Sequence, residues 1–301
     1  MINLEEYKIC KADSKEWARY HAIYRLSNFN EWMSLSFEGD IDRYLKVDFC
    51  YWVMIGGIKV GGALIKPNML KCVFTIPPFN NKEILINKLS EYVESISDES
   101  KPIEVPDADL ESVKYYQNIG YKLEEVNKLM VCPTNKYEVT WDEQYEIISP
   151  DESRHAADMV ELYFQSYSKN KLPQIAAQSY EFQVSSVNVC FNFINGGSVP
   201  KDWSTLVFDK LTNKLVAACT VALVNNLPYI LDFVVHPEYQ RRGLATKMMK
   251  RTLNLFKNDY PAIRLNNVVG NDAEILYNKL GFISLAEKAL MKKEQHNEKI
   301  N

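Results

Sequence analysis

The sequence predicts a mixed α/β (α+β) protein of two similar domains in tandem, each with a central mixed, mostly antiparallel sheet flanked by helices. The chain has 301 residues, whereas one domain usually has roughly 100–200 residues. Hydrophobic residues make up 47% and charged residues 25%, as in globular proteins and unlike disordered ones. The third observation is a long internal repeat.

The repeat is clearest near the end of each half. The segment Tyr116-Gln-Asn-Ile-Gly120-Tyr121 matches Tyr277-Asn-Lys-Leu-Gly281-Phe282, and a Leu-Met pair follows each segment at the same distance. Two long copies exclude a solenoid, which is built from many short units. A polar connection with a helix-breaking proline follows the first copy at 133–136. We therefore expect one domain at 1–135 and the other at 136–301.

The second copy is the longer one. Tyr7 corresponds to Tyr145 and Tyr121 to Phe282, so the offset between the copies grows from 138 to 161 residues. Most of the excess lies between residues 168 and 204. Two interpretations stay open: a longer loop without a role, or a segment that selects the substrate, since binding residues collect on loops held by a scaffold. If this segment selects the substrate, its candidate contact residues are the aromatic side chains Tyr180, Phe182 and Trp203.

The second copy is expected to follow the order β-α-β-β-β-α-β-α-β. Asp151 can cap a helix with one apolar face, and Gly281 is typical of a helix end. The polar turn at 210–213 separates two strands, and the apolar run from Tyr229 to Val235 is typical of a buried strand. The expected strands are 145–148, 205–208, 215–224, 229–235, 263–268 and 286–291. The expected helices are 151–167, 243–256 and 273–280.

Composition and charge exclude several classes of protein. The net charge is −4, whereas general nucleic-acid binders carry a basic footprint. The longest apolar stretch, at 216–224, is too short to cross a bilayer as a helix, and the N-terminal residues lack the apolar core of a secretory signal. The six cysteines and four histidines are scattered. We therefore expect no metal, no membrane association, and reduced, mostly buried thiols in a cytoplasmic protein.

The segment from Val234 to Thr246 carries the most chemical information. It predicts a strand, a loop with Arg241 and Arg242, a glycine at 243, and the start of a helix. The N–H groups of a helix N-terminus attract anions, and the two arginines add charge suited to phosphate. A pyrophosphate site is one interpretation of this pattern, and an ordinary basic helix cap is the other.

These residues resemble a known family. Gln240-Arg-Arg-Gly243-Leu-Ala245, preceded by Val235-His-Pro237, is similar to the coenzyme-A motif Q/R-x-x-G-x-G/A of the GNAT superfamily of acetyltransferases. The later Asn271…Ala273…Leu276-Tyr277-x-Lys279-x-Gly281-Phe282 resembles the C-terminal motif of that family. The resemblance covers 145–291 and implies an acetyl-CoA-dependent enzyme with the predicted order of strands and helices.

The resemblance implies roles for individual residues. Tyr277 would be the general acid that protonates the leaving thiolate, because the reference pKa of a phenol is close to that of a thiol. Periodicity alone makes Tyr277 a core aromatic residue. The family places an asparagine seven residues before this tyrosine, where the chain has Gly270, so a contact from Asn271 stays open. The coenzyme-binding set would be Phe233, Val234, Val235, Gln240, Arg241, Arg242, Gly243, Leu244, Ala245, Thr246 and Asn271.

The acceptor amine must lose a proton, and Asp232 is the candidate to take it. Asp232 is the single acid in the apolar run at 229–235, and an acid in such a run usually has a reason to be there. Strand alternation places Asp232 and Val234 on one face and Phe233 and Val235 on the other. A catalytic or amine-binding role is one interpretation, and a solvent-facing or loop-capping carboxylate is the other.

The first copy resembles a degenerate version of the same domain. Alignment of Pro77 with Pro237 places Glu83 opposite Gly243 and Leu85 opposite Ala245. An acid opposes anion binding, and a leucine blocks the approach of a ligand. Tyr116, which matches Tyr277, is therefore expected to be structural. The tryptophans Trp17, Trp32 and Trp52 are expected in the core.

The leading hypothesis is a tandem acetyltransferase that is active in its second domain. It would move the acetyl group of acetyl-CoA directly to a small-molecule or peptide amine, without an enzyme-bound acyl group. Within the enzyme class, a longer acyl donor or a hydroxyl acceptor stays open. The alternative from another class is a non-catalytic acyl-CoA-binding regulatory module. A homodimer stays open, and no nucleic-acid partner is expected.

Overall fold

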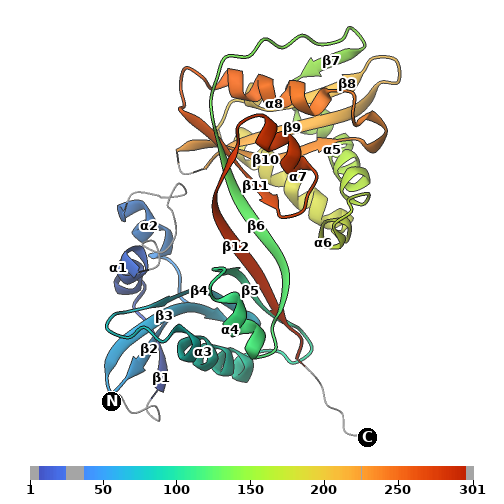
Figure 1. Cartoon of the computed structure of the whole chain (residues 1–301). Coiled ribbons are helices and arrows are strands. Elements are labelled where there is room, and N and C mark those ends of the chain that lie inside the picture. The colour runs from blue at the N-terminus through green and yellow to red at the C-terminus, as the bar shows by residue number, and fades with distance from the viewer. Residues whose placement is uncertain (1–6, 25–36, 225, 296–301) are drawn as a thin grey trace, which may run out of the picture. The chain divides into compact units, whose positions relative to one another are not determined.

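The computed structural model describes residues 7–24, 37–224 and 226–295, and they form two compact units (Figure 1). The first unit comprises residues 1–128 with 285–301, and the second comprises residues 129–284. Each contains a mixed sheet with helices on both faces, which confirms the predicted fold class.

The first unit has the strand order β1-β2-β3-β4-β5-β12. The pair β4–β5 is parallel and the other pairs are antiparallel. Helices α3 and α4 contribute to the core on one face, and α1 and α2 contribute to the core on the other. The strands are β1 (Tyr7–Lys11), β2 (Cys50–Ile55), β3 (Ile58–Lys66), β4 (Met69–Thr75), β5 (Ile103–Ala108), β6 (Lys122–Pro133) and β12 (Ile283–Lys293). The helices are α1 (Ser14–Tyr24), α2 (Phe37–Tyr44), α3 (Lys82–Ile96) and α4 (Val113–Asn118).

The second unit has the strand order β6-β11-β10-β9-β8-β7, with β10–β11 as a parallel pair. Its further strands are β7 (Tyr145–Ile148), β8 (Thr205–Asp209), β9 (Lys214–Val224), β10 (Leu227–Val235) and β11 (Ala262–Val268). Its helices are α5 (Glu152–Tyr167), α6 (Pro173–Ala176), α7 (Tyr180–Asn195), α8 (Leu244–Leu255) and α9 (Ala273–Lys279). The expected elements of this copy agree with these bounds to within three residues, and α6 and α7 were not expected.

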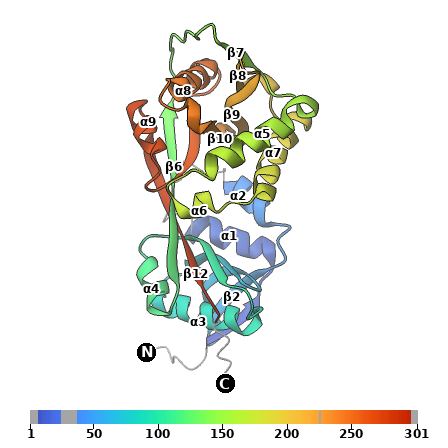
Figure 2. The ribbon, with the colours of Figure 1, turned by 90° about the vertical axis from the view of Figure 1, so that its right-hand side faces the viewer.

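The sheet of the second unit separates two hydrophobic cores. Figure 2 shows α8 and α9 on one side of the strands and α5 and α7 on the other. One face of α8 and its C-cap residue is apolar and lies in the first of these cores, with at most 1% of each residue exposed; its members include Leu244, Met248, Leu253 and Phe256. On the other side, residues of α5 and α7 pack against β8, β9 and β10.

Each unit contains a strand segment that the repeat assigns to the other copy. Strand β12 ends the second copy, yet from residue 285 it belongs to the first unit, where Ala289 pairs with Ala108 and Met291 with Val105. Strand β6 ends the first copy, yet Met130 packs in the α8 core of the second unit. The compact units therefore differ from the predicted domains 1–135 and 136–301. A repeat records common descent, whereas compactness also depends on which strands pair.

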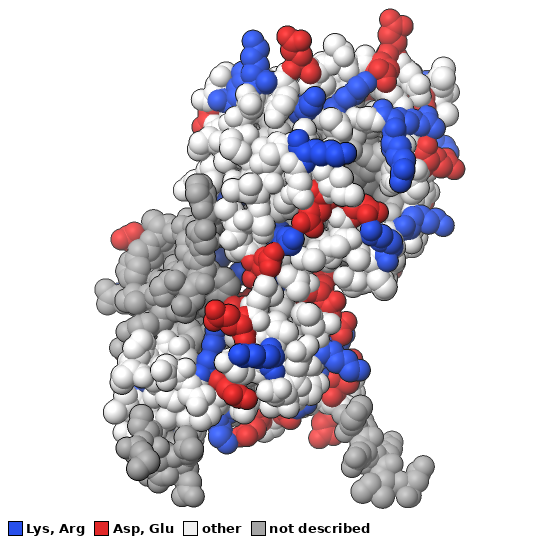
Figure 3. Space-filling view, viewed as in Figure 1, with Lys and Arg blue, Asp and Glu red and all other residues white. Residues whose placement is uncertain are grey.

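Several composition-based expectations can be compared with the structure. All six cysteines are free and five are buried, as expected for structural thiols. Trp17 and Trp52 are buried, and Trp32 lies outside the described residues. Among the described residues no helix is long and apolar enough to span a membrane, and no group of three potential metal ligands is present. On the face drawn in Figure 3, basic and acidic side chains are interspersed.

Replacement of Met291 should destabilise the first unit rather than the second. Met291 is fully buried in the first unit's core, and truncation of such a side chain to alanine typically costs about 2–5 kcal/mol. We expect Met291→Ala to reduce the hydrogen-exchange protection of β5 and α3. The control is Ile283→Ala on the same strand, whose side chain is 59% exposed. Loss of protection confined to β9–β11 would contradict the assignment of β12 to the first unit.

Candidate functional site

Strand β10 loses one of its two neighbours halfway along its length. Tyr229 and Ile230 pair in parallel with Arg264 and Leu265 of β11. Beyond this point β10 stays antiparallel to β9 as far as Val235, while no further β10–β11 pair is present among the described residues. The two parallel strands therefore separate. The backbone N–H and C=O groups of β10 that face β11 are left available to a ligand.

A β-bulge lies where the strands separate. The register between β10 and β9 shifts between Ile230 and Asp232, which leaves Leu231 as the extra residue. Ile230 and Phe233 consequently pack on the α8 side, whereas Leu231 packs on the α5 side and Asp232 contacts α5. Bulges often re-aim a side chain beside a functional site. Here the bulge turns a carboxylate toward α5.

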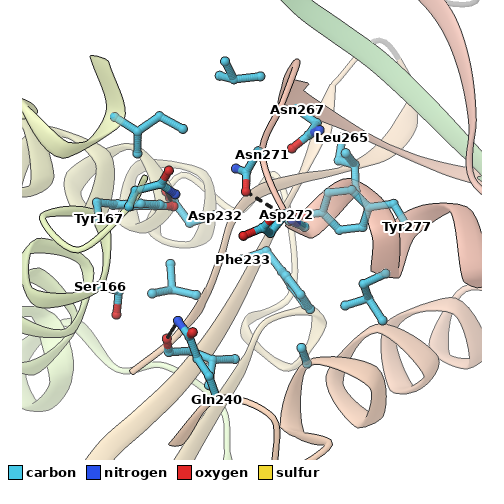
Figure 4. Close-up of a pocket in the computed structure, with 18 of the residues that line it drawn as sticks. Ser166, Tyr167, Asp232, Phe233, Gln240, Leu265, Asn267, Asn271, Asp272 and Tyr277 are labelled. Carbon is cyan, nitrogen blue, oxygen red and sulfur yellow. Dashed lines mark hydrogen bonds between the residues drawn. The ribbon is translucent and has the colours of Figure 1, made fainter. Parts of the chain in front are cut away.

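The separated strands open into a cleft of about 700 Å³ (Figure 4). All of its lining residues belong to the second unit. They come from β10, from the β10–α8 loop with the start of α8, from β11 with α9, and from the segment after α5. From the first three segments they are Ile230, Asp232, Phe233, Val234, Val235, Tyr239, Gln240, Arg241, Gly243, Leu244, Ala245, Thr246, Leu265, Asn266, Asn267, Val268, Asn271, Asp272, Ala273, Leu276 and Tyr277.

The loop before α8 places the helix N-terminus in the wall of the cleft. Gly243, the N-cap residue, has a left-handed φ of +81°, and no side chain caps the helix. A Cβ atom on Gly243 would meet nothing within 4 Å, so the backbone conformation, rather than crowding within the chain, favours glycine here. Arg241 is also left-handed, with φ +61°. The first N–H groups of α8 have no intrahelical partner and can bind an anion.

The side chains of this loop divide between the cleft and the surface. Gln240 and Arg241 line the cleft, and Gln240 Nε2 donates to the last carbonyl of β10 at 3.3 Å. Arg242 donates to the backbone carbonyl of Glu238 at 2.9 Å and lies over the ring of Tyr239, 4.6 Å from its centroid. The Arg242 guanidinium therefore braces the loop and is not among the groups that line the cleft.

Tyr277 reaches the cleft from α9. Its ring lies 6.1 Å from that of Phe233 and 5.6 Å from that of Phe282, measured between centroids, and the side chain is 5% exposed. Tyr277 is thus both a core aromatic residue and a lining residue. Burial, with a smaller effect of Cys219, raises the pKa of its hydroxyl above the ordinary value. The hydroxyl is protonated at neutral pH, as an ordinary phenol is. The raised pKa places it further from the pKa of a thiol than the reference values do, so proton transfer to a thiolate is less balanced than the sequence alone indicates.

Asp232 lies beside α5, on the opposite side of Phe233 from Tyr277 (Figure 4). The side chain is 9% exposed, and its Oδ1 accepts a hydrogen bond from the Tyr167 hydroxyl at 3.2 Å. Burial raises the pKa of Asp232 to about 6, although hydrogen bonds from Tyr167 and Thr220 act to lower it. The solvent-facing interpretation of Asp232 is therefore wrong. The carboxylate is therefore mostly ionised at neutral pH, and its pKa lies only about one unit below that pH, so it can accept a proton.

Three further polar residues lie at or near the cleft, and the sequence indicated only one of them. Asn271 lines the cleft, and its Oδ1 accepts from the Ala273 N–H at 3.1 Å, which leaves its Nδ2 group for a ligand. Sequence reasoning missed Asn267, which is 4% exposed on β11 and has no partner for Nδ2 among the described residues. Two adjacent asparagines near the end of an expected strand were a visible signal for it. No local signal marks Tyr167, because its partner Asp232 lies 65 positions away.

The enlarged segment at 168–204 contains helices rather than a plain loop. Ser179 caps α7 by accepting from the Phe182 N–H at 3.2 Å. Of the three aromatic residues expected to select the substrate, Phe182 lines the cleft. Tyr180 instead packs edge-on against Phe164, with 5.5 Å between ring centroids. Trp203 packs edge-on against Phe256 at the end of α8, with 4.8 Å between ring centroids.

The raised pKa of Asp232 predicts a specific dependence of stability on pH. The folded protein binds this proton more tightly than the unfolded chain, whose reference pKa is 3.8. Its contribution to stability is therefore greatest below about pH 4 and is lost as the pH rises through about 6. We expect the difference in free energy of unfolding between wild type and Asp232→Asn to shift by about 3 kcal/mol across that range. A difference that is constant between pH 4 and 7, measured by urea unfolding, would contradict the burial argument.

Comparison with known proteins connects this geometry to a family. Residues 202–284 match the family model described as acetyltransferase (GNAT) domain. No curated protein sequence matches the chain. A GCN5-related N-acetyltransferase from Sphaerobacter thermophilus is similar in structure over 96% of this chain and 96% of its own, with a TM-score of 0.70 at 12% identity.

Two further structures are similar over almost the whole chain. A tandem GNAT protein from the clavulanic acid biosynthesis pathway aligns over 97% of this chain and 100% of its own, with a TM-score of 0.62 at 13% identity. A GNAT-family acetyltransferase from Colwellia psychrerythraea aligns over 95% and 98%, with a TM-score of 0.58 at 14% identity. At these identities the likeness shows the fold. The chain therefore has a GNAT fold, and its residues 202–284 are similar to the acetyltransferase (GNAT) domain, a family whose chemistry is acyl transfer from an acyl-CoA.

Proposed function

We propose that the second unit binds acetyl-CoA in the cleft and transfers the acetyl group directly to an amine. One observation carries the proposal: the separated strands β10 and β11, the uncapped N-terminus of α8 and Tyr277 all line the same cavity. An acyl-CoA needs an anion site for its pyrophosphate, open strand backbone for its amide-bearing arm and a proton donor for its sulfur. The cleft supplies all three.

The coenzyme would be held mainly by main-chain groups. The N–H groups of residues 241–246 surround the N-terminus of α8 and would bind the pyrophosphate. Gln240 and Arg241 add side chains from the same wall, and Arg242 contributes its backbone and its charge. The backbone groups of Phe233 and Val235 that face away from β9 would bind the pantetheine arm and the acetyl carbonyl, whereas Val234, which also lines the cleft, has its backbone paired with β9.

The chemical step needs one proton delivered and one removed. The neutral amine nitrogen attacks the thioester carbon, the carbon–sulfur bond breaks, and the departing sulfur takes the proton of the Tyr277 hydroxyl. The amine proton passes to Asp232, directly or through water. Because its pKa is about 6, Asp232 is ionised at neutral pH and ready to accept this proton. Tyr167 holds the carboxylate in place by its hydrogen bond.

Direct transfer is supported by the positions of the thiols. No cysteine is among the described residues that line the cleft. Cys219 lies on β9 and is fully buried, with a Thr252 hydroxyl 3.5 Å from its sulfur. Burial raises the pKa of this thiol to about 11, so it is not a nucleophilic thiolate at neutral pH. The proposal therefore includes no enzyme-bound acyl group.

The first unit supports the interpretation of a degenerate copy. Helix α3, which corresponds to α8, has a side-chain cap, because Asn81 Oδ1 accepts from the Ile84 N–H at 3.1 Å. Glu83 adds an acid to its first turn. Tyr116 is 1% exposed and packs in the core against Tyr121. The helix N-terminus is thus occupied by the chain's own groups, and we propose that this unit does not bind the coenzyme.

Calorimetric titration of acetyl-CoA into the protein tests the coenzyme site. We expect one binding event per chain, and we expect Gly243→Glu to raise the Kd at least about tenfold, or about 1.4 kcal/mol. The variant places a carboxylate at the anion site and a side chain in a left-handed conformation. Gly197→Glu is the matched control, because Gly197 also has a positive φ, +69°, and open space around it.

The same titration can refute the proposal. Two binding events per chain would show that the first unit also binds the coenzyme. The absence of binding to the wild-type protein would remove the acetyltransferase hypothesis. Binding without turnover of any amine would favour the alternative of a regulatory acyl-CoA-binding module.

Removal of the Tyr277 hydroxyl should slow the chemical step and leave coenzyme binding intact. We expect Tyr277→Phe to lower kcat by a factor of about 10²–10⁴, the usual contribution of general acid catalysis, with the Kd for acetyl-CoA unchanged. Release of coenzyme A thiol in the presence of an acceptor amine gives the rate. Tyr116→Phe is the control, because Tyr116 occupies the matching position of the first copy. Equal kcat values for wild type and Tyr277→Phe would exclude Tyr277 as the acid.

A further inference from the structure

The segment between α5 and β8 contributes a fixed amide group to the cleft. Gln178, in the turn before α7, lines the cavity. Its Oε1 accepts a hydrogen bond from Nε2 of Gln183 at 3.1 Å. Gln183 is fully buried in the first turns of α7, so it has little freedom to move. The pair holds one end of the Gln178 amide and leaves its other end to form a hydrogen bond with a ligand.

A hydroxyl of this wall has no hydrogen-bond partner among the described residues. Ser166 lines the cleft, and its buried Oγ has no hydrogen-bond partner among the described residues. Ser186 of α7 adds a second hydroxyl, and Phe182 adds an apolar surface. Buried polar groups are normally satisfied by protein, water or ligand. This part of the cleft therefore matches a molecule that carries neutral oxygens.

The loop at 168–172 restricts the size of that molecule. Lys171 forms an ion pair with Asp272, in the turn between β11 and α9. The Leu172 side chain packs against the same turn: its Cδ2 atom is 3.7 Å from where a Cβ atom would lie if Gly270 had one. The loop thus joins the α5 side of the cleft to the α9 side at its rim. An extended polypeptide has less room at a bridged rim than a compact molecule has.

The charges of the cleft complete the argument. Asp232 is a buried acid in the part of the cleft proposed for the acceptor, and its negative charge attracts an ammonium group. The charge of Lys171 is balanced by Asp272. Lys169 also lines the cleft but is exposed, and an exposed cation surrounded by water contributes little to binding. A cationic amine with neutral oxygens fits this set better than an amine with a carboxylate.

We infer that the acceptor is a small primary amine bearing hydroxyl or carbonyl oxygens, that Gln178 is a specificity-determining residue for it, and that Gln183 is the positioning residue that orients Gln178. The inference rests on the proposed transfer reaction and goes beyond it by naming the acceptor class. Asp232 would hold the amino group, and Gln178 with Ser166 would hold the oxygens.

A matched pair of amines tests the inference with the full-length protein and saturating acetyl-CoA. Serinol (2-amino-1,3-propanediol) and isopropylamine share a carbon skeleton and differ by two hydroxyls. The quantity to compare is the ratio of their kcat/KM values, in wild type and in each variant. Because both amines are measured with every protein, the difference in their basicity cancels between variants.

The variants separate the roles of the two glutamines. We expect Gln178→Leu to lower the serinol-to-isopropylamine ratio about five- to tenfold, the effect of one uncharged hydrogen bond. Gln183→Leu should lower it by a smaller factor, through the KM for serinol, with kcat for isopropylamine unchanged. The control is Gln174→Leu on α6, in the same segment but outside the cleft lining; it should leave the ratio unchanged. Calorimetry with acetyl-CoA verifies that the second unit of each variant is folded.

Several outcomes would overturn the inference. An unchanged ratio in Gln178→Leu would remove its role in specificity. Preference for L-serine over serinol, abolished by Lys169→Ala, would assign a carboxylate-bearing acceptor instead. Faster acetylation of a Ser-Gly-Gly peptide than of serinol would show that the bridged rim does not select small molecules. Coenzyme binding without turnover of either amine would refute the acceptor class alone, whereas the absence of coenzyme binding would refute the proposed function as well.

Discussion

The site depends on the separation of β10 from β11 after Ile230 and Leu265. In a continuous sheet the backbone groups of residues 232–235 would be used in a ladder, and no ligand could reach them. The bulge at Leu231 marks the point of separation and also sets which side chains face each core. The exposed backbone, the direction of Asp232 and the space in front of α8 therefore follow from one local irregularity in the sheet.

The same irregularity separates two kinds of proton chemistry. Tyr277 lies on the α8 side of β10 and Asp232 on the α5 side, with Phe233 between them. Burial acts on both, but with different consequences, because desolvation disfavours the charged form of each group. A phenol is already protonated at neutral pH, and burial makes its hydroxyl hold the proton more tightly. For a carboxylate it moves the pKa toward neutrality and so improves a base.

Features encoded by neighbouring residues could be predicted from the sequence, and features that depend on distant pairs could not. The loop at Gly243 is local, so its residue types reveal both a left-handed turn and a helix N-terminus. The apolar face of α8 is likewise local, because it follows from the spacing of apolar residues within the helix itself. The bulge at Leu231 leaves no such pattern, because it is defined by the register against β9. Strand alternation did place Asp232 on the face of Val234, as the structure has it, but which helix covers that face and the hydrogen bond from Tyr167 could not be known from the sequence. Helix α7 did carry a local signal, the capping Ser179, which the interpretation as a loop overlooked.

Pairing of distant strands also places constraints on the first copy that do not depend on coenzyme binding. Strand β12 follows the motif that carries Tyr277, yet its Ala289 and Met291 are fully buried in the first unit. Met130 of β6 is 1% exposed in the core of the second unit, beside the residues of α8. Each core thus depends on a segment that the repeat assigns to the other copy. Loss of coenzyme binding by the first copy would relax the constraints on Glu83 and Leu85. It would not relax the constraints on Met130, Ala289 and Met291, because each of these residues is buried in a core.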